Sequence, residues 1–288
     1  MAISSKHHYI PQFFLNGFTN DQGEFYIYDK QRDQIKSKSF PPSTHFFEKD
    51  RNTIVMDGQA DDTPEQLFGL FENREKVIVK FIQEQKGIPQ LSMQQMVDLQ
   101  IFLSNLFFRL PVLDSTFKRY MEDTSFPLRE LKVKNRISGE AAPPELMEKL
   151  RMDPSFQRMY RPAIGSMVLL RSNSIEDHEN WGFSLRSDSN NLLSDNPLIF
   201  DDLRTLDFFE NSFVMPMTGR HKLIRVKKKI SKTQLSPKFA LMSEVLMIHQ
   251  AKQFVCCASR AVLEQMVSAS KVFDIELCRK AVFEELRQ

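Results

Sequence analysis

The chain has 288 residues, near the upper end of what one hydrophobic core supports, so one elaborate domain or two subdomains are both compatible with this length. Its composition, 41% hydrophobic and 26% charged, is that of a folded soluble protein, and a net charge of +2 is too small to indicate nucleic-acid binding by itself. The 9 glycines argue against a glycine-rich doubly wound sheet, whereas 25 phenylalanines and 14 methionines indicate large packing surfaces between helices.

The cysteines and the apolar segments indicate the cellular compartment and whether a zinc site is expected. Cys256, Cys257 and Cys278 are odd in number and two of them are adjacent, so we expect no disulfide framework, and no Cys/His spacing typical of a zinc site occurs. The N-terminus lacks the apolar core of a signal peptide. The richest apolar stretch, residues 99–113, is interrupted by Arg109 and falls short of the ~18 residues of a membrane span. We therefore expect a cytoplasmic protein with no membrane partner, no structural zinc site and no assigned metal ligand.

The first predicted element is a short helix over residues 4–18, whose apolar side chains face the core. Pro11 places His7 and His8 before this helix or in its first turn. A turn signal then leads into a predicted β-hairpin over residues 24–39.

Helical periodicity dominates the next part of the chain. A hydroxyl cap followed by proline and an acid predicts a helix over residues 63–86, Ser92 caps a second helix that ends before Pro111, and a third helical piece covers 112–121. The polar, proline-rich stretch 123–153 has the composition of a linker or mobile loop.

The remaining elements alternate in type. A helix is expected at residues 155–170, and short strands follow at residues 181–185, 198–200, 213–217 and 222–226. The tail returns to helices, predicted at residues 237–258, 260–268 and 274–286.

These elements together predict an α+β fold that is mostly helical, with an N-terminal β-hairpin and a small antiparallel sheet in the C-terminal half. We expect a single domain over residues 1–288. A subdivision into 1–122, a linker-like 123–153 and 154–288 is compatible with the same pattern.

The adjacent histidines His7 and His8 do not form a ready metal clamp, because neighbouring side chains diverge on a helix and point to opposite faces of a strand. A general base needs only one imidazole that faces a pocket, so His8 is a catalytic candidate and His7 a binding candidate. The structural alternative is that one histidine makes a buried hydrogen bond to the backbone while the other is solvated.

Two further groups need an explanation. Ser194, Asp195 and Asn196 either form a turn that leaves a strand or present a hydroxyl, a carboxylate and an amide at a strand end, where sites commonly form. Arg109 lies in an apolar helix face, where it either makes a structural ion pair or binds an anion such as phosphate. The charged segment 48–51 is expected to be a solvated turn.

Several segments resemble one known family. KHHYIPQFFLNGFTNDQGEFYIYDK is similar to the opening signature of the domain of unknown function 4238 family, and the likeness continues in the same order through STHFFEKDRNTI, LQIFLSNLFFRLP, LLSDNPLIF, FVMPMTGRHKLI and HQAKQFVCCAS. The resemblance implies a mostly helical α+β unit found widely in bacteria. It marks His8, Arg109, Ser194, Asp195 and Asn196 as positions that match family motifs, and it implies no activity. The chain departs from the pattern at Ile248-His249, where an asparagine is expected.

The leading functional hypothesis is a hydrolase that acts on phosphate esters, with a nucleotide or nucleic acid as its partner. His8 would act as general base or acid, Asp195 would orient it or hold a metal, and Arg109 would bind the anion. Packing of the first helix on the small sheet would bring His8 and Asp195 together. Two alternatives stay open: a non-catalytic interaction module in which these groups form a structural network, and a toxin or defence effector that docks another protein. No cofactor is indicated.

Overall fold

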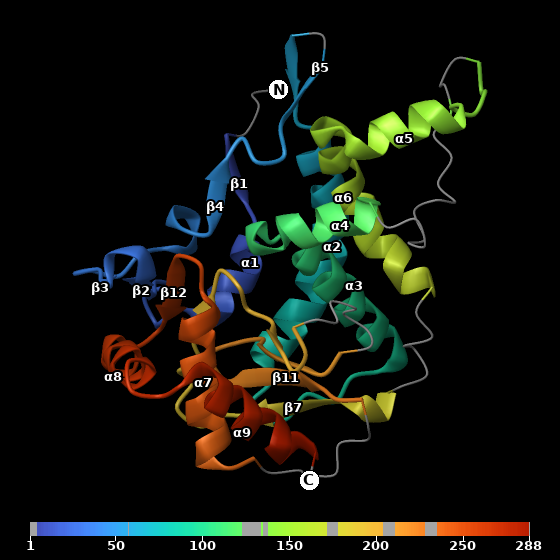
Figure 1. Ribbon diagram of the computed structural model, residues 1–288. Helices are drawn as coiled ribbons and strands as arrows, with labels where there is room; N and C mark the ends of the chain where they lie inside the picture. The colour runs from blue at the N-terminus through green and yellow to red at the C-terminus, as the bar shows by residue number, and fades with distance from the viewer. Residues whose placement is uncertain are drawn as a thin grey trace. The chain divides into compact units, whose positions relative to one another are not determined.

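The computed structural model describes residues 5–56, 58–122, 134, 138–171, 178–203, 211–227 and 235–287 (Figure 1). Helices and several small antiparallel sheets make up these residues, which agrees with the predicted α+β class. No single helix among them has the length and apolar character of a membrane span; α3 (Met93–Arg109) and the segment Pro111–Arg119 reach it only together, across a bend of 72°.

The chain forms two compact units, and neither of them is continuous in sequence. The first unit consists of Met1–Tyr9, Phe47–Glu75 and Asp98–Ser172, and the second consists of Ile10–Phe46, Lys76–Val97 and Asn173–Gln288.

The first unit combines two small sheets with helices. Strand β1 (Lys6–His8) pairs antiparallel with β4 (Phe47–Lys49), and β5 (Ile54–Met56) pairs with β6 (Gln59–Asp61). The helices of this unit are α4 (Asp114–Glu122), α5 (Pro144–Met152), α6 (Pro154–Arg171) and the parts of α2 (Thr63–Glu84) and α3 that it includes. Helix α5 corrects the expectation of a linker over residues 123–153, of which 123–133 and 135–137 lie outside the described residues.

The opening segment differs from the predicted helix over residues 4–18. Residues 6–8 form a strand, and helix α1 covers only Gln12–Leu15 before a 3-10 turn at Asn16–Phe18. The reason is that Pro11 disfavours a helical conformation at the residue before it, while β4 offers a partner strand. The predicted core residues Phe14, Leu15 and Phe18 are fully buried, as expected.

The second unit contains two four-stranded antiparallel sheets. The first has the strand order β7-β11-β10-β9, and its strands are β7 (Trp181–Leu185), β9 (Ile199–Phe200), β10 (Phe213–Pro216) and β11 (His221–Arg225). The second has the order β3-β2-β12-β8, and its strands are β2 (Tyr26–Asp29), β3 (Gln34–Ile35), β8 (Leu193–Ser194) and β12 (Phe254–Cys257). The predicted hairpin is β2 with β3.

Three helices complete the second unit: α7 (Pro237–Gln250), α8 (Arg260–Ser270) and α9 (Ile275–Arg287). Figure 1 shows α7 and α9 beside β7 and β11, and residues of all three helices and both sheets share one apolar core. The expectation that one helix continues to residue 258 is wrong, because α7 ends at Gln250 and residues 254–257 form the central strand β12. A short buried apolar run has no periodicity that separates strand from helix.

Candidate functional site

His7 answers the question raised by the two adjacent histidines. It is fully buried in strand β1, and its Nδ1 accepts a hydrogen bond of 2.9 Å from the backbone N–H of Asn52. This contact fits one half of the structural alternative, a buried histidine bonded to the backbone, whereas His8 is half-buried rather than solvated. The ring of His8 packs against Phe47 with centroids 5.4 Å apart. His7 therefore orders the loop that follows β4.

Arg109 lies inside a helical environment of the first unit with a side chain that is only 3% exposed. Its guanidinium is 3.0 Å from the carboxylate of Glu72 and 3.9 Å from that of Glu65, and it stacks over the ring of Phe68 at 4.6 Å. These contacts are those of a structural ion pair, because the positive charge already has two acidic partners. The backbone carbonyl of Arg109 also accepts a bond of 3.2 Å from Nε of Arg51.

Asp195 holds the segment that connects α7 to β12. It is buried, and its carboxylate accepts hydrogen bonds from three backbone N–H groups: Lys252 at 2.8 Å, Gln253 at 2.6 Å and Phe254 at 3.0 Å. Burial raises the pKa of the Asp195 carboxyl, and the three amides and the nearby Lys30 ammonium only partly offset this effect. All these contacts lie within the second unit and fix the course of the chain.

The neighbours of Asp195 complete a turn. Ser194 Oγ donates to the carbonyl of Asn196 at 2.8 Å and accepts from its N–H at 3.2 Å, while Asn196 Nδ2 donates to the carbonyl of Gln250 at 3.2 Å. These are the contacts of the predicted turn. His8 and Arg109 belong to the first unit and Asp195 to the second, so their joint site stays a prediction.

A polar cleft of about 550 Å³ lies in the first unit, and its walls are formed by residues 48–52 after β4 and by parts of α4 and α6. Its charged lining comprises five cationic and three anionic side chains: Lys49, Arg51, Lys118, Arg158 and Arg161 against Glu48, Asp50 and Asp114. We call it the arginine cleft.

An ion-pair network forms the floor of the arginine cleft. Arg51, with a side chain 8% exposed, contacts Glu48 and Asp114 at 2.7 Å each, and Arg161 contacts the same Asp114 carboxylate at 2.7 Å. Burial acts to raise the pKa of Asp114, but the hydrogen bonds and charges of the two arginines outweigh it and lower that pKa. Asp114 is therefore ionised and shared by two guanidinium groups.

The network is balanced in charge, because Arg51 and Arg161 are matched by Glu48 and Asp114. Burial lowers the pKa of Arg161, Asp114 raises it, and the positive charges of Arg51 and Arg158 lower it further. Its Nε is buried and has no hydrogen-bond partner among the described residues. The guanidinium of Arg161 also stacks over the ring of Phe117 at 4.8 Å, so ion pairing and stacking hold it in place.

Comparison with models of protein families shows to which family the chain belongs. The family model described as "Protein of unknown function (DUF4238)" matches residues 6–262. The chain belongs to this family. No curated protein and no solved structure matches it.

The DUF4238 match covers the arginine cleft and the Asp195 turn alike. Three of the segments by which the resemblance was recognised meet at Arg51. The opening segment contacts the loop of Arg51 through the hydrogen bond between His7 and Asn52. The segment STHFFEKDRNTI contains Arg51 itself and strand β4. The segment LQIFLSNLFFRLP supplies the backbone carbonyl of Arg109.

Sequence reasoning missed the cleft of this DUF4238 member because residues 48–51 were expected to be a solvated turn. The turn exists, with Asp50 at φ 52°, a left-handed conformation that aspartate tolerates better than most residues. Arg51, however, points inward to Asp114, and no local pattern reveals a partner 63 residues away. The similarity of STHFFEKDRNTI to the family was the one sequence signal that included Arg51.

His45 is a further buried polar group in a family segment. It lies in the second unit between the rings of Phe40 and Phe254, and its Nε2 is 2.7 Å from Nζ of Lys36. An ammonium group only donates, so Nε2 accepts and Nδ1 carries the proton toward the hydroxyl of Thr44. Burial and the positive charge of Lys36 lower the pKa of His45 to about 4, against a smaller opposing effect of Asp29.

We expect His45 to make the protein less stable as the pH falls from about 6.5, its unfolded pKa, towards 4. In this window the unfolded state binds more protons at His45 than the folded state, so protonation favours unfolding, with a total effect on the order of 3 kcal/mol. Urea unfolding at pH 7 and pH 4.5 should show a smaller pH dependence for His45→Gln than for the parent chain. Lys36→Met should reduce it in part, and equal slopes for all three proteins would contradict the expectation.

Proposed function

We propose that the arginine cleft of the first unit binds the phosphate group of a nucleotide or of a nucleic acid. The observation that carries the proposal is the excess of positive charge in the cleft, where five cationic side chains stand against three anionic ones. A planar guanidinium matches two oxygens of a phosphate, and the bonds that it makes to an ionised acceptor are among the strongest in proteins.

The charge balance favours a phosphate over a carboxylate. The cationic side chains of the cleft outnumber the anionic ones by two, and a phosphate monoester carries about −1.5 to −2 charges at neutral pH. The exposed Arg158 and Lys118 stand at the edge of the cleft, and their contacts with the Thr53 carbonyl at 2.9 Å and with Glu122 at 4.0 Å are exposed ones that a ligand can replace. Arg51 and Asp114 would not contact the ligand themselves; their role is to hold Arg161 in position.

The contacts of the candidate residues support binding more than hydrolysis. The charge of Arg109 is engaged by Glu65 and Glu72, and the carboxylate of Asp195 is engaged by three amides. The low pKa of Asp114 makes it a weak base. Among the functions considered from the sequence, a non-catalytic module is therefore favoured, and hydrolysis of the bound ester by His8 remains a separate hypothesis.

Titration calorimetry with inorganic phosphate, adenosine monophosphate and a short single-stranded oligonucleotide tests the proposal. We expect binding of at least one of these ligands, weakened about tenfold by Arg158→Gln or Lys118→Gln, which corresponds to about 1.4 kcal/mol for one lost charge-assisted contact. The matched control is Arg119→Gln, which removes an equally exposed charge from α4 but lies outside the cleft lining.

Two outcomes would overturn the proposal. One is the absence of binding for all three ligands, and the other is equal weakening by Arg119→Gln and Lys118→Gln. If the oligonucleotide alone binds, the slope of its affinity with salt gives the number of phosphates contacted. Release of phosphate or of shorter products during the titration would revive the hydrolase hypothesis.

A further inference from the structure

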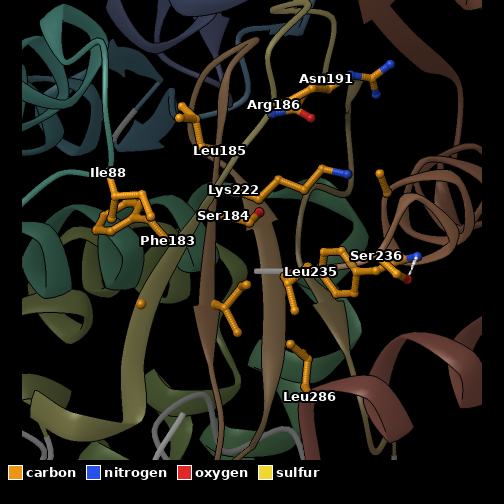
Figure 2. A pocket seen from close by; sticks show the side chains of 14 residues that line it. Ile88, Phe183, Ser184, Leu185, Arg186, Asn191, Lys222, Leu235, Ser236 and Leu286 are labelled. Carbon is orange, nitrogen blue, oxygen red and sulfur yellow. Dashed lines mark hydrogen bonds between the residues drawn. The ribbon is translucent and has the colours of Figure 1, made fainter. Parts of the chain in front are cut away.

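The second unit contains a different pocket, a cavity of about 350 Å³ among β7, β11, α7 and α9. Most of its wall is apolar, contributed by Ile88, Ile224, Leu235, Phe239 and Leu286. Figure 2 shows Arg186, Asn191 and Lys222 at one end of the pocket and Leu235 and Leu286 at the other. The pocket thus has a polar end and an apolar end, and its volume is in the range of small-molecule sites.

The polar end contains a buried charge cluster that needs an explanation. Lys222 is 4% exposed, and its Nζ lies 2.8 Å from the carboxylate of Glu244 and 2.5 Å from Oγ of Ser243. Arg186 contacts the same Glu244 oxygen at 3.1 Å, and the other oxygen accepts the backbone N–H of Leu192 at 3.0 Å. Glu244 thus serves two cations and one amide in a buried position.

Lys222 retains capacity for a ligand. Its ammonium has three N–H donors, and two of them are accounted for by Glu244 and Ser243 among the described residues. Burial of cationic groups is unfavourable unless acceptors surround them, and an acceptor that enters through the cavity would supply the missing contact. Arg186 lies at the same end, where its Nε and Nη2 donate to Asp188 and its Nη1 donates to Glu244.

We propose that this pocket binds a small molecule with an apolar body and a carboxylate head. The apolar body would contact the leucine, isoleucine and phenylalanine side chains, and the carboxylate would accept from the third N–H of Lys222, with the positive charge of Arg186 nearby. A hydroxyl group would bring an acceptor without charge, and a protonated amine would bring no acceptor for the Lys222 N–H, so both should bind more weakly. This site is in the second unit and is independent of the arginine cleft.

Calorimetric titration of the full chain with octanoate, octanol and octylamine tests the ligand class. We expect octanoate to bind at least about tenfold more tightly than octanol, and octylamine to bind more weakly than either. Equal binding of octanoate and octanol would overturn the assignment of the head group. Failure of all three to bind would overturn the site.

Two variants locate the binding in this pocket. Ala240→Leu places a larger side chain in the wall and should weaken octanoate binding at least about tenfold, and Arg186→Gln should weaken octanoate but not octanol. Lys238→Gln is the matched control, because it removes an exposed charge from the same helix outside the lining. Unchanged affinity in both Ala240→Leu and Arg186→Gln would show that octanoate binds elsewhere and would overturn the proposal. A thermal melt of each variant without ligand confirms that it is folded.

Discussion

Replacement of Glu244 by alanine is expected to destabilise the protein by about 3–5 kcal/mol, the usual effect of removing one partner of a buried ion pair. The reason is that Lys222 would remain buried with its charge uncompensated, and the N–H of Leu192 would lose its acceptor. Arg186 would be less affected, because it also pairs with the half-exposed Asp188. Denaturant unfolding at neutral pH measures the change.

A double substitution separates the stability effect of the uncompensated charge from the effect of the lost side-chain volume. Lys222→Met combined with Glu244→Leu removes both charges and keeps most of the packing, so we expect it to be clearly more stable than Glu244→Ala alone. Glu264→Ala serves as a control, since Glu264 pairs with Arg260 at the surface and should change stability by at most about 1 kcal/mol. A loss of similar size for Glu244→Ala and Glu264→Ala would show that the buried cluster is not needed for stability.

Asp195→Ala is expected to cost about 3 kcal/mol or more, because three amides that now bond to the carboxylate would lose their acceptor together. Asp195→Asn should also destabilise, since an amide group offers one acceptor oxygen and turns N–H groups toward the other amides. Denaturant unfolding measures both variants. Asp21→Ala, in an exposed turn, is the control and should stay within about 0.5 kcal/mol of the parent.

The same Asp195 variants test the catalytic hypothesis. A residue that only oriented a histidine would lower an activity while the stability stayed near that of the parent chain. Stability unchanged in Asp195→Ala would therefore remove the structural role and strengthen the predicted pairing with His8.

Elements whose signals are local were predictable from the sequence. Helix α2 begins at Thr63 with proline next, and α3 follows Ser92, whose Oγ accepts from the backbone N–H of Gln95 at 3.3 Å. The β2–β3 hairpin and the β10–β11 pair also join neighbouring segments, so their turn residues and alternating apolar positions were sufficient.

Features that depend on distant partners were not predictable. The four residues of β12 form a strand because they pair with β2 and β8, and their own sequence does not indicate a strand. The sequence identified Asp195 as part of a turn, but not that its carboxylate accepts hydrogen bonds from the backbone of residues 252–254. Likewise, Arg51 is buried because it pairs with the distant Asp114. Single-sequence patterns describe what a segment prefers and contain no information about which remote segment it meets.

The interleaved course of the chain has a consequence for synthesis on the ribosome. Strand β2, complete at Asp29, is paired along its length by β12, which ends at Cys257, so its sheet cannot close until most of the chain has emerged. Contacts of such sequence separation close slowly, and partly folded chains with open strand edges tend to aggregate. The first unit has all its segments once Ser172 has emerged, whereas the second unit also needs the segment that begins at Asn173. We therefore expect the second unit to fold only after Cys257 has emerged, and to depend on chaperones while the edge of β2 that pairs with β12 is open.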